Sequence, residues 1–146
     1  MKPLITISCF LFLSVISFSQ VATTFDNARG QGISMAHLDS LYASGISVFN
    51  GYEDEYFETW KKMLQDLADF LKKNDFTWGK TTRCFNRIYF KSNGSIDYFL
   101  YMFNTPIDPE KEQQFDALQN QFIQSYKFGM AAPVNFSQCG PVVYND

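Results

Sequence analysis

Apolar residues repeat at intervals of three and four between residues 53 and 73, which is the spacing of one face of an α-helix. The first turn of this segment is acidic and its last turn is basic, a distribution that complements the helix dipole. The pattern therefore predicts a long helix over residues 53–73. Its apolar stripe consists of Phe57, Trp60, Leu64, Leu67 and Leu71.

Two further helices are predicted from the residues at their ends. Ser34 is suited to cap a short helix that Gly45 ends, because a Ser hydroxyl accepts a hydrogen bond from a free first-turn amide and Gly readily adopts a left-handed conformation. Asp108 and Pro109 are suited to begin a second long helix, which Gly129 ends. The apolar stripe of that helix is Phe115, Leu118 and Phe122.

Residues 83–103 change to a period of two around Asn93-Gly94, the pair favoured in a type I′ hairpin turn. A hairpin with a two-residue loop follows, and it fixes which residues oppose one another across the two strands. The predicted pairs are Ser92 with Ser95, Phe90 with Asp97, Ile88 with Phe99, Asn86 with Tyr101 and Cys84 with Phe103.

The apolar tail from Val134 to Tyr144 predicts a third strand, which Gly140-Pro141 interrupts. Proline donates no backbone hydrogen bond and is tolerated mostly on sheet edges, so this strand is predicted to lie on an edge. After a crossover helix it would pair beside the first strand. The expected fold class is α+β: a three-stranded antiparallel sheet in the order 2-1-3, packed by two long helices, with a ββαβ core preceded by helices.

The 146 residues of the chain have the size of one domain. Residues 1–19 match a secretory signal peptide, because Lys2 precedes an apolar run that ends in small residues at Ser17-Phe18-Ser19. The run is too short for a membrane anchor. We expect residues 20–33 to form a flexible lead-in and residues 34–146 to form the single domain.

Export places the chain in the periplasm or outside the cell. Removing residues 1–19 takes Lys2 from the 12 basic residues and leaves the 15 acidic ones, a net charge of about −4. A chain this acidic does not suit nucleic acid. The expected partner is a protein of the cell envelope, a homodimer stays open, and no transmembrane anchor is expected in the mature chain.

Cys84 and Cys139 are the two cysteines outside the signal segment. An even pair in an exported chain favours a disulfide. The strand order 2-1-3 agrees with it, because antiparallel neighbours bring the start of one strand near the end of the other. A bridge over a loop of this length would contribute about 3–4 kcal/mol in the chain-entropy model.

The sequence offers no convincing catalytic or metal site. His37 is the only histidine, and a catalytic dyad or a zinc site needs an imidazole held by a further partner. The acidic run at residues 53–58 lies at a helix start, where such charges are usually solvated. We therefore expect no enzyme activity, no metal and no cofactor.

Two surfaces remain as candidates for binding: the aromatic outer face of the hairpin and the edge of the last strand. A large apolar patch left open is unusual in a monomer, so either residues 21–50 or a second chain covers the outer face. The candidate binding residues are Phe85, Tyr89 and Tyr98 on the face and Val134, Phe136, Val142 and Val143 on the edge strand.

Residues 83–144, with a hairpin that turns at Asn93-Gly94, then a helix and a closing strand, resemble the carboxy-terminal domain of TonB-type energy transducers. The resemblance implies a periplasmic domain that pairs a sheet edge, here Val134 to Val143, with a segment of an outer-membrane receptor. The signal ending Ser17-Phe18-Ser19-Gln20 is similar to that of exported proteins of Bacteroidetes-type bacteria.

The expected function is a non-catalytic periplasmic or secreted protein-binding module that acts by β-strand addition at a sheet edge. The alternative is a small secreted inhibitor or immunity-type protein. Such a protein would present a protruding loop such as residues 74–80, with Trp78 as an exposed anchor.

Overall fold

A computed structural model describes residues 20–146, and the predicted signal peptide lies outside the described residues. None of the described helices is both long enough and apolar enough to cross a membrane. In chain order the elements are β1 (Val21–Thr24), α1 (Phe25–Gly30), α2 (Met35–Leu41), β2 (Ala43–Ser44), α3 (Gly45–Val48), α4 (Glu53–Lys73), β3 (Thr82–Phe90), β4 (Ile96–Phe103), α5 (Pro109–Ser125) and β5 (Phe136–Tyr144).

The sheet has five strands in the order β1-β4-β3-β5-β2. Strands β4 and β5 run antiparallel to β3, whereas β1 pairs in parallel with β4 and β2 pairs in parallel with β5. The fold is α+β, but the prediction of a three-stranded antiparallel sheet is wrong. Strands β1 and β2 have only four and two residues, too few for alternation to show in the sequence.

The expected flexible lead-in at residues 20–33 is also corrected, because this segment contains β1 and α1. Ala22 is buried and exchanges two hydrogen bonds with one side chain of α5: its N–H donates to Asn120 Oδ1 at 3.0 Å, and its carbonyl accepts from Asn120 Nδ2 at 2.7 Å. Pairing with β4 and α5 therefore orders a segment that has no periodicity of its own.

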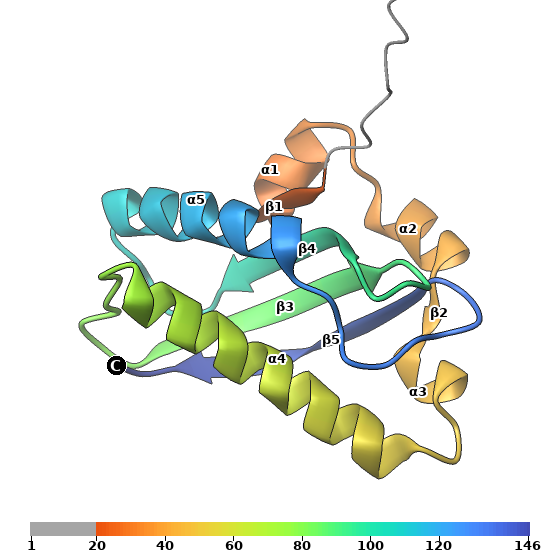
Figure 1. The fold of residues 1–146 in the computed structure, drawn as a ribbon. Coiled ribbons are helices and arrows are strands. Elements are labelled where there is room, and N and C mark those ends of the chain that lie inside the picture. Colours follow the sequence, from red (N-terminus) through yellow and green to blue (C-terminus); the bar gives the residue numbers. More distant parts are fainter. Residues whose placement is uncertain (1–19) are drawn as a thin grey trace, which may run out of the picture.

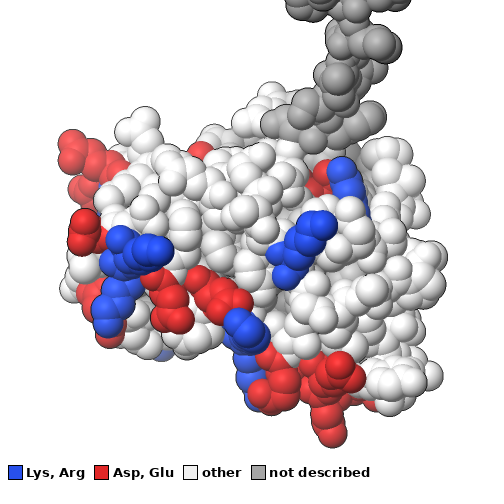
Figure 2. Space-filling model, in the orientation of Figure 1, with Lys and Arg blue, Asp and Glu red and all other residues white. Residues whose placement is uncertain are grey.

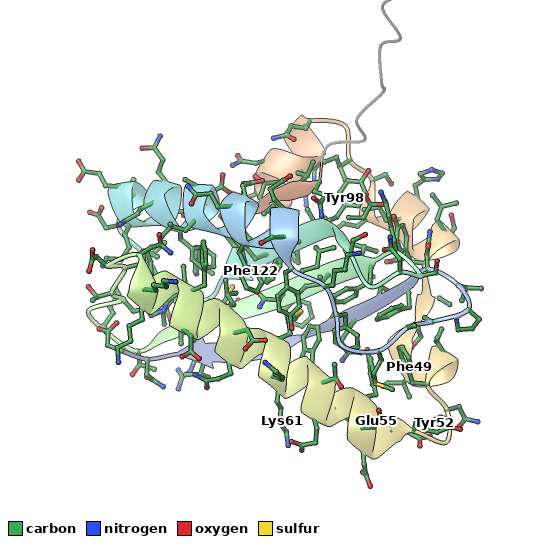
Figure 3. The ribbon with its side chains drawn as sticks, in the orientation of Figure 1. Phe49, Tyr52, Glu55, Lys61, Tyr98 and Phe122 are labelled. Carbon is green, nitrogen blue, oxygen red and sulfur yellow. The ribbon has the colours of Figure 1, made fainter. Side chains whose placement is uncertain are left out.

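Helices α4 and α5 lie across one face of the sheet, here called the inner face (Figure 1). The core beneath them is largely aromatic. Figure 3 shows Phe122 between the two helices, where its ring lies 5.6 Å from that of Phe70. Helices α1 and α2 pack on the opposite, outer face through Ala28, Leu38 and Tyr42.

The three helix predictions are confirmed in position, with shifted ends. Helix α4 has the predicted bounds. Helix α5 begins at Pro109, where Asp108 accepts from two amides, but it ends at Ser125, before Gly129. Helix α2 is capped by Ser34 and ends at Leu41 rather than at Gly45, which begins α3 instead.

The predicted type I′ turn is wrong: Asn93 does not have a positive φ, and the Lys91 carbonyl accepts from the Gly94 N–H at 2.8 Å, so Ser92 does not oppose Ser95. The hairpin register agrees with the prediction away from the turn and differs beside it. Ile88 opposes Phe99 as predicted, but a bulge between Tyr89 and Phe90 makes Phe90 oppose Ile96 rather than Asp97. A bulge reverses the faces of the residues that follow it. Ile96 therefore lies in the inner core instead of on the outer face.

The predicted disulfide between Cys84 and Cys139 is wrong. Both thiols are free, Cys84 buried and Cys139 exposed. In the register of β3 with β5, Cys84 opposes Val142 and Cys139 opposes Arg87. Because side chains alternate along a strand, this offset of three residues places the two sulfurs on opposite faces of the sheet.

Candidate functional site

Part of the outer face is covered and offers nothing to a partner. Tyr89 is fully buried, its ring meets that of Tyr42 edge to face at 5.1 Å, and its hydroxyl donates to Asp39 Oδ1 at 2.9 Å. Tyr98 is partly buried against the same cluster. The segment that contains α1 and α2 thus covers this half, which is the first of the two alternatives predicted from the sequence, cover by residues 21–50 or by a second chain. Tyr89 has no free surface for binding.

The other part of the outer face is covered only in part: Phe25, at the start of α1, meets the ring of Phe85 edge to face at 6.4 Å. Phe85 opposes Met102 on β4 and Pro141 on β5, so the three side chains form a row across three strands. Beside this row Arg83 opposes Val143. Met102 is 45% exposed and Val143 is 54% exposed. We call these five strand residues the open face.

The open face carries one positive charge on an acidic chain. Its strand residues include Arg83, for which no carboxylate partner occurs among residues 20–146. Arg87, next along β3, donates to Asp39, whose other oxygen accepts from Tyr89. Arg83 is therefore the arginine of this face whose charge is available to a ligand.

Beside the open face lies a strand edge. Strand β2 pairs only with Phe136 and Ser137 of β5. From Gln138 to Tyr144, β5 has β3 on one side and, within residues 20–146, no strand on the other. The prediction that this strand ends the sheet is wrong, because β2 lies beyond it, but only the first two of its nine residues are paired on both sides.

The backbone direction of this edge follows from Arg83. The Arg83 carbonyl accepts from the N–H of Asn104 at 2.8 Å, so its backbone groups face β4. The residue that opposes it on β5, Val143, must then point its N–H and carbonyl away from β3. Cys139 and Pro141 share this direction, because directions alternate along a strand. Pro141 has no N–H to offer, so the edge presents two N–H groups and three carbonyls, of which that of Cys139 already accepts from Gln138 Nε2 at 3.2 Å.

A groove runs along the inner side of the same edge. It has a volume of about 510 Å³ and is lined by α4 and by the end of β5. Figure 1 shows α4 crossing in front of β5, and Figure 3 shows Lys61 at the border of α4. The α4 residues that line it are Lys61, Leu64, Gln65 and Ala68, and the β5 side runs from Pro141 to Asn145.

Some of the binding residues predicted from the sequence lie at this surface, and others are buried or lie elsewhere. Phe85, Val142 and Val143 lie together at the edge, on the open face or in the groove. Phe136 is fully buried and stacks on Phe90 at 4.8 Å, and Val134 lies before β5 in an exposed loop. The hydrophobic pattern of the tail could not separate these positions, because both buried and exposed strand positions there are apolar.

Sequence reasoning missed Met102, Lys61 and Leu64. The groove forms because the middle of α4 crosses the end of β5, a packing that no local pattern encodes. The sequence did carry one signal for Met102: it lies on the same predicted hairpin face as Phe85. Trp78, the anchor expected for an inhibitor, is only 6% exposed and stacks on Tyr144 at 4.6 Å.

Burial explains the shifted pKa values of the groups near this surface. Burial raises the pKa of the Cys84 thiol to about 12. The pKa of Tyr89 is raised above its ordinary value, first by burial and then by its hydrogen bond to Asp39. Both groups stay protonated near neutral pH, so the buried thiol does not supply a thiolate nucleophile.

A polar cleft of about 330 Å³ beside the start of β5 is lined by Asp39, Arg87 and Cys139 among others. Its charged groups bond to one another and to Tyr89. The two charged side chains of this cleft, Asp39 and Arg87, are therefore already paired with each other.

A scan of protein-family models, a search of curated proteins and a search of solved structures each returned no match to this chain. The fold and the surface define an α+β domain with a partly covered outer sheet face. Among residues 20–146 it also has a strand edge without a partner strand, with a groove beside that edge. Functional inference therefore rests on this geometry.

Proposed function

We propose that this chain is a non-catalytic protein-binding module of the periplasm or the extracellular space, which takes up an extended segment of a partner protein at the free edge of β5. One observation carries the proposal: the first two residues of β5 already accept the parallel strand β2, and the next seven residues continue that edge without a strand partner within residues 20–146.

Main-chain pairing would supply the part of the affinity that does not depend on sequence. Cys139 and Val143 each offer an N–H and a carbonyl, and Pro141 offers a carbonyl, as derived from the register above. Each such hydrogen bond contributes about 0.5–1.5 kcal/mol net. Side-chain pockets beside the edge supply specificity in this mode of binding, and here the groove along α4 supports that role.

The inhibitor-type alternative receives no support from the loop expected to carry it. The Trp78 side chain is buried, and its backbone N–H donates to the Asp146 carboxylate at 2.5 Å. The resemblance to TonB-type domains agrees with strand addition and stays a prediction, as does the exported location.

A crosslinking capture from the native cell envelope tests the proposal, with mass spectrometry of the captured peptides. The test variant is Val143→Pro, which removes an outward N–H that the ladder with β3 does not use. The matched control is Val143→Thr, which keeps the N–H and the branched shape. Val142→Pro is unsuitable because Val142 directs its N–H toward β3, so the change would break the sheet.

We expect one partner to be recovered with the unchanged protein and with Val143→Thr, and to be lost with Val143→Pro. Hydrogen exchange gives a second readout, since the amides of Cys139 and Val143 should exchange slowly only in the complex. A partner that binds Val143→Pro equally well, with no new protection at these amides, would refute strand addition.

A further inference from the structure

A strand added to β5 would divide its side chains between two different surfaces. Side chains alternate along a strand, and directly opposed residues point to the same face. Residues that oppose Val142 would therefore point into the groove along α4. Residues that oppose Pro141 or Val143 would lie on the outer side, beside the open face.

The groove side favours apolar side chains. Leu64 of α4 and Val142 of β5 both line the groove and pack against the core, and Ala68 leaves room between them. Charges along α4 are locally balanced: Lys61 pairs with Glu58 and Lys62 pairs with Asp66, and Figure 2 shows the two signs next to each other along this border. The groove thus offers apolar area without a net preference for either sign.

The outer side favours carboxylates. Arg83 opposes Val143, so only β5 separates it from an added strand. An arginine side chain is long enough to reach across one neighbouring strand, because strands lie about 4.8 Å apart. The outward residues of β5 here are Cys139, Pro141 and Val143, and none of them carries a charge. A carboxylate on the added strand would therefore meet an unpaired guanidinium and no competing acid from β5.

The geometry points to a partner segment of defined chemistry: an extended stretch in which apolar side chains alternate with Glu or Asp, with the apolar set in the α4 groove and the carboxylates directed toward Arg83. This inference rests on the proposed strand addition at β5. It adds the side-chain pattern by which the site would select a segment.

Two short fluorescein-labelled peptides test this pattern by fluorescence anisotropy. One peptide alternates valine with glutamate, and the other alternates valine with lysine. The protein variants are Arg83→Glu, which reverses the charge at the open face, and Arg29→Glu, which makes the same change on exposed helix α1 next to the opposite sheet edge. Val143→Pro and Val143→Thr report on strand addition itself.

We expect the unchanged protein to bind the glutamate peptide about tenfold more tightly than the lysine peptide at about 50 mM salt. The preference should shrink at about 500 mM salt because exposed charges are screened. Arg83→Glu should abolish the preference, and Arg29→Glu should keep it. Equal affinities for the two peptides, or a preference that survives Arg83→Glu, would overturn the inference.

The same experiment separates this inference from the proposed function. If both peptides bind equally and both are lost with Val143→Pro, strand addition stands and the charge pattern fails. If the glutamate preference persists undiminished in Val143→Pro, the strand edge is not the binding site. If neither peptide binds the unchanged protein, both proposals fail.

Discussion

Replacing Gly45 with alanine is expected to destabilise the domain, because Tyr56 occupies the space that a β-carbon would need. A Cβ at Gly45 would lie 2.0 Å from the Tyr56 hydroxyl oxygen and 2.6 Å from its ring carbon Cζ. Gly45 does not have a positive φ. The backbone therefore suits alanine, and the effect is steric.

The magnitude follows from what Tyr56 would lose on moving. Its side chain is fully buried, stacks on Phe49 at 4.8 Å and donates to Gln138 Oε1 at 2.8 Å. The hydrogen bond is worth about 1 kcal/mol, and overpacking a core position costs about 1–3 kcal/mol. We therefore expect a loss of about 2–4 kcal/mol, which corresponds to a fall in Tm of about 6–15 °C.

Thermal and urea unfolding, followed by circular dichroism, measure this loss. The matched control is Gly30→Ala, since a Cβ at Gly30 meets nothing within 4 Å; this change should be neutral or slightly stabilising. The double variant of Gly45→Ala with Tyr56→Phe lacks the Tyr56 hydroxyl, which is the closest contact of the new Cβ. Its loss in free energy of unfolding should be about 1 kcal/mol smaller than the sum of the losses of the two single variants. A Gly45→Ala protein as stable as Gly30→Ala would refute this packing.

Two smaller predictions concern side chains that the fold buries. In a chain that begins at Gln20, DTNB should react quickly with the exposed thiol of Cys139, and this reaction should be lost in Cys139→Ser. Cys84 should react only after unfolding, because burial raises its pKa to about 12. A folded protein without any reactive thiol would contradict this prediction. The buried Gln119 amide has no hydrogen-bond partner among residues 20–146, so Gln119→Met should raise the free energy of unfolding by about 1–2 kcal/mol in urea titrations. Gln121→Met, exposed on the same helix, should change it by less than about 0.5 kcal/mol, and a destabilised Gln119→Met would show that the amide is satisfied.

The parts of the fold that could be predicted are those that a local pattern encodes. Helix α4 has 21 residues, a continuous stripe and charges suited to both ends. The hairpin reverses near Asn93-Gly94 as predicted, although through a turn of another type. Strands β1 and β2 exist only through pairing with β4 and β5. Their own sequences are too short to show a period, so the mixed topology could not be read in advance.

The predicted disulfide failed for a different reason, namely register. Strand order alone brings Cys84 and Cys139 to neighbouring strands, as the sequence indicated. Two such cysteines can form a disulfide only if their side chains lie on the same face of the sheet. A shift of one residue in the strand register moves a side chain to the other face. The bulge before Phe90 had the same kind of effect on Ile96. Face assignments beside the turn and at the cysteines were therefore unreliable. Tyr89 lies on its predicted face and is buried because the segment of α1 and α2 covers it, whereas Phe136 lies in the inner core.

Pro141 makes the affinity of the proposed site depend on the side chains of the bound segment. An open strand edge is a liability, because any extended segment can pair with it, and proline on an edge reduces such pairing. Pro141 lies in the middle of the free part of β5 and removes one of the outward donors. The remaining donors at Cys139 and Val143 are separated by this gap, so backbone pairing alone would hold an arbitrary segment weakly. A segment that also fills the α4 groove and pairs with Arg83 would gain binding free energy that replaces the missing hydrogen bond at Pro141. Pro141 thus makes binding depend on the side chains of the segment, and the site can discriminate between segments.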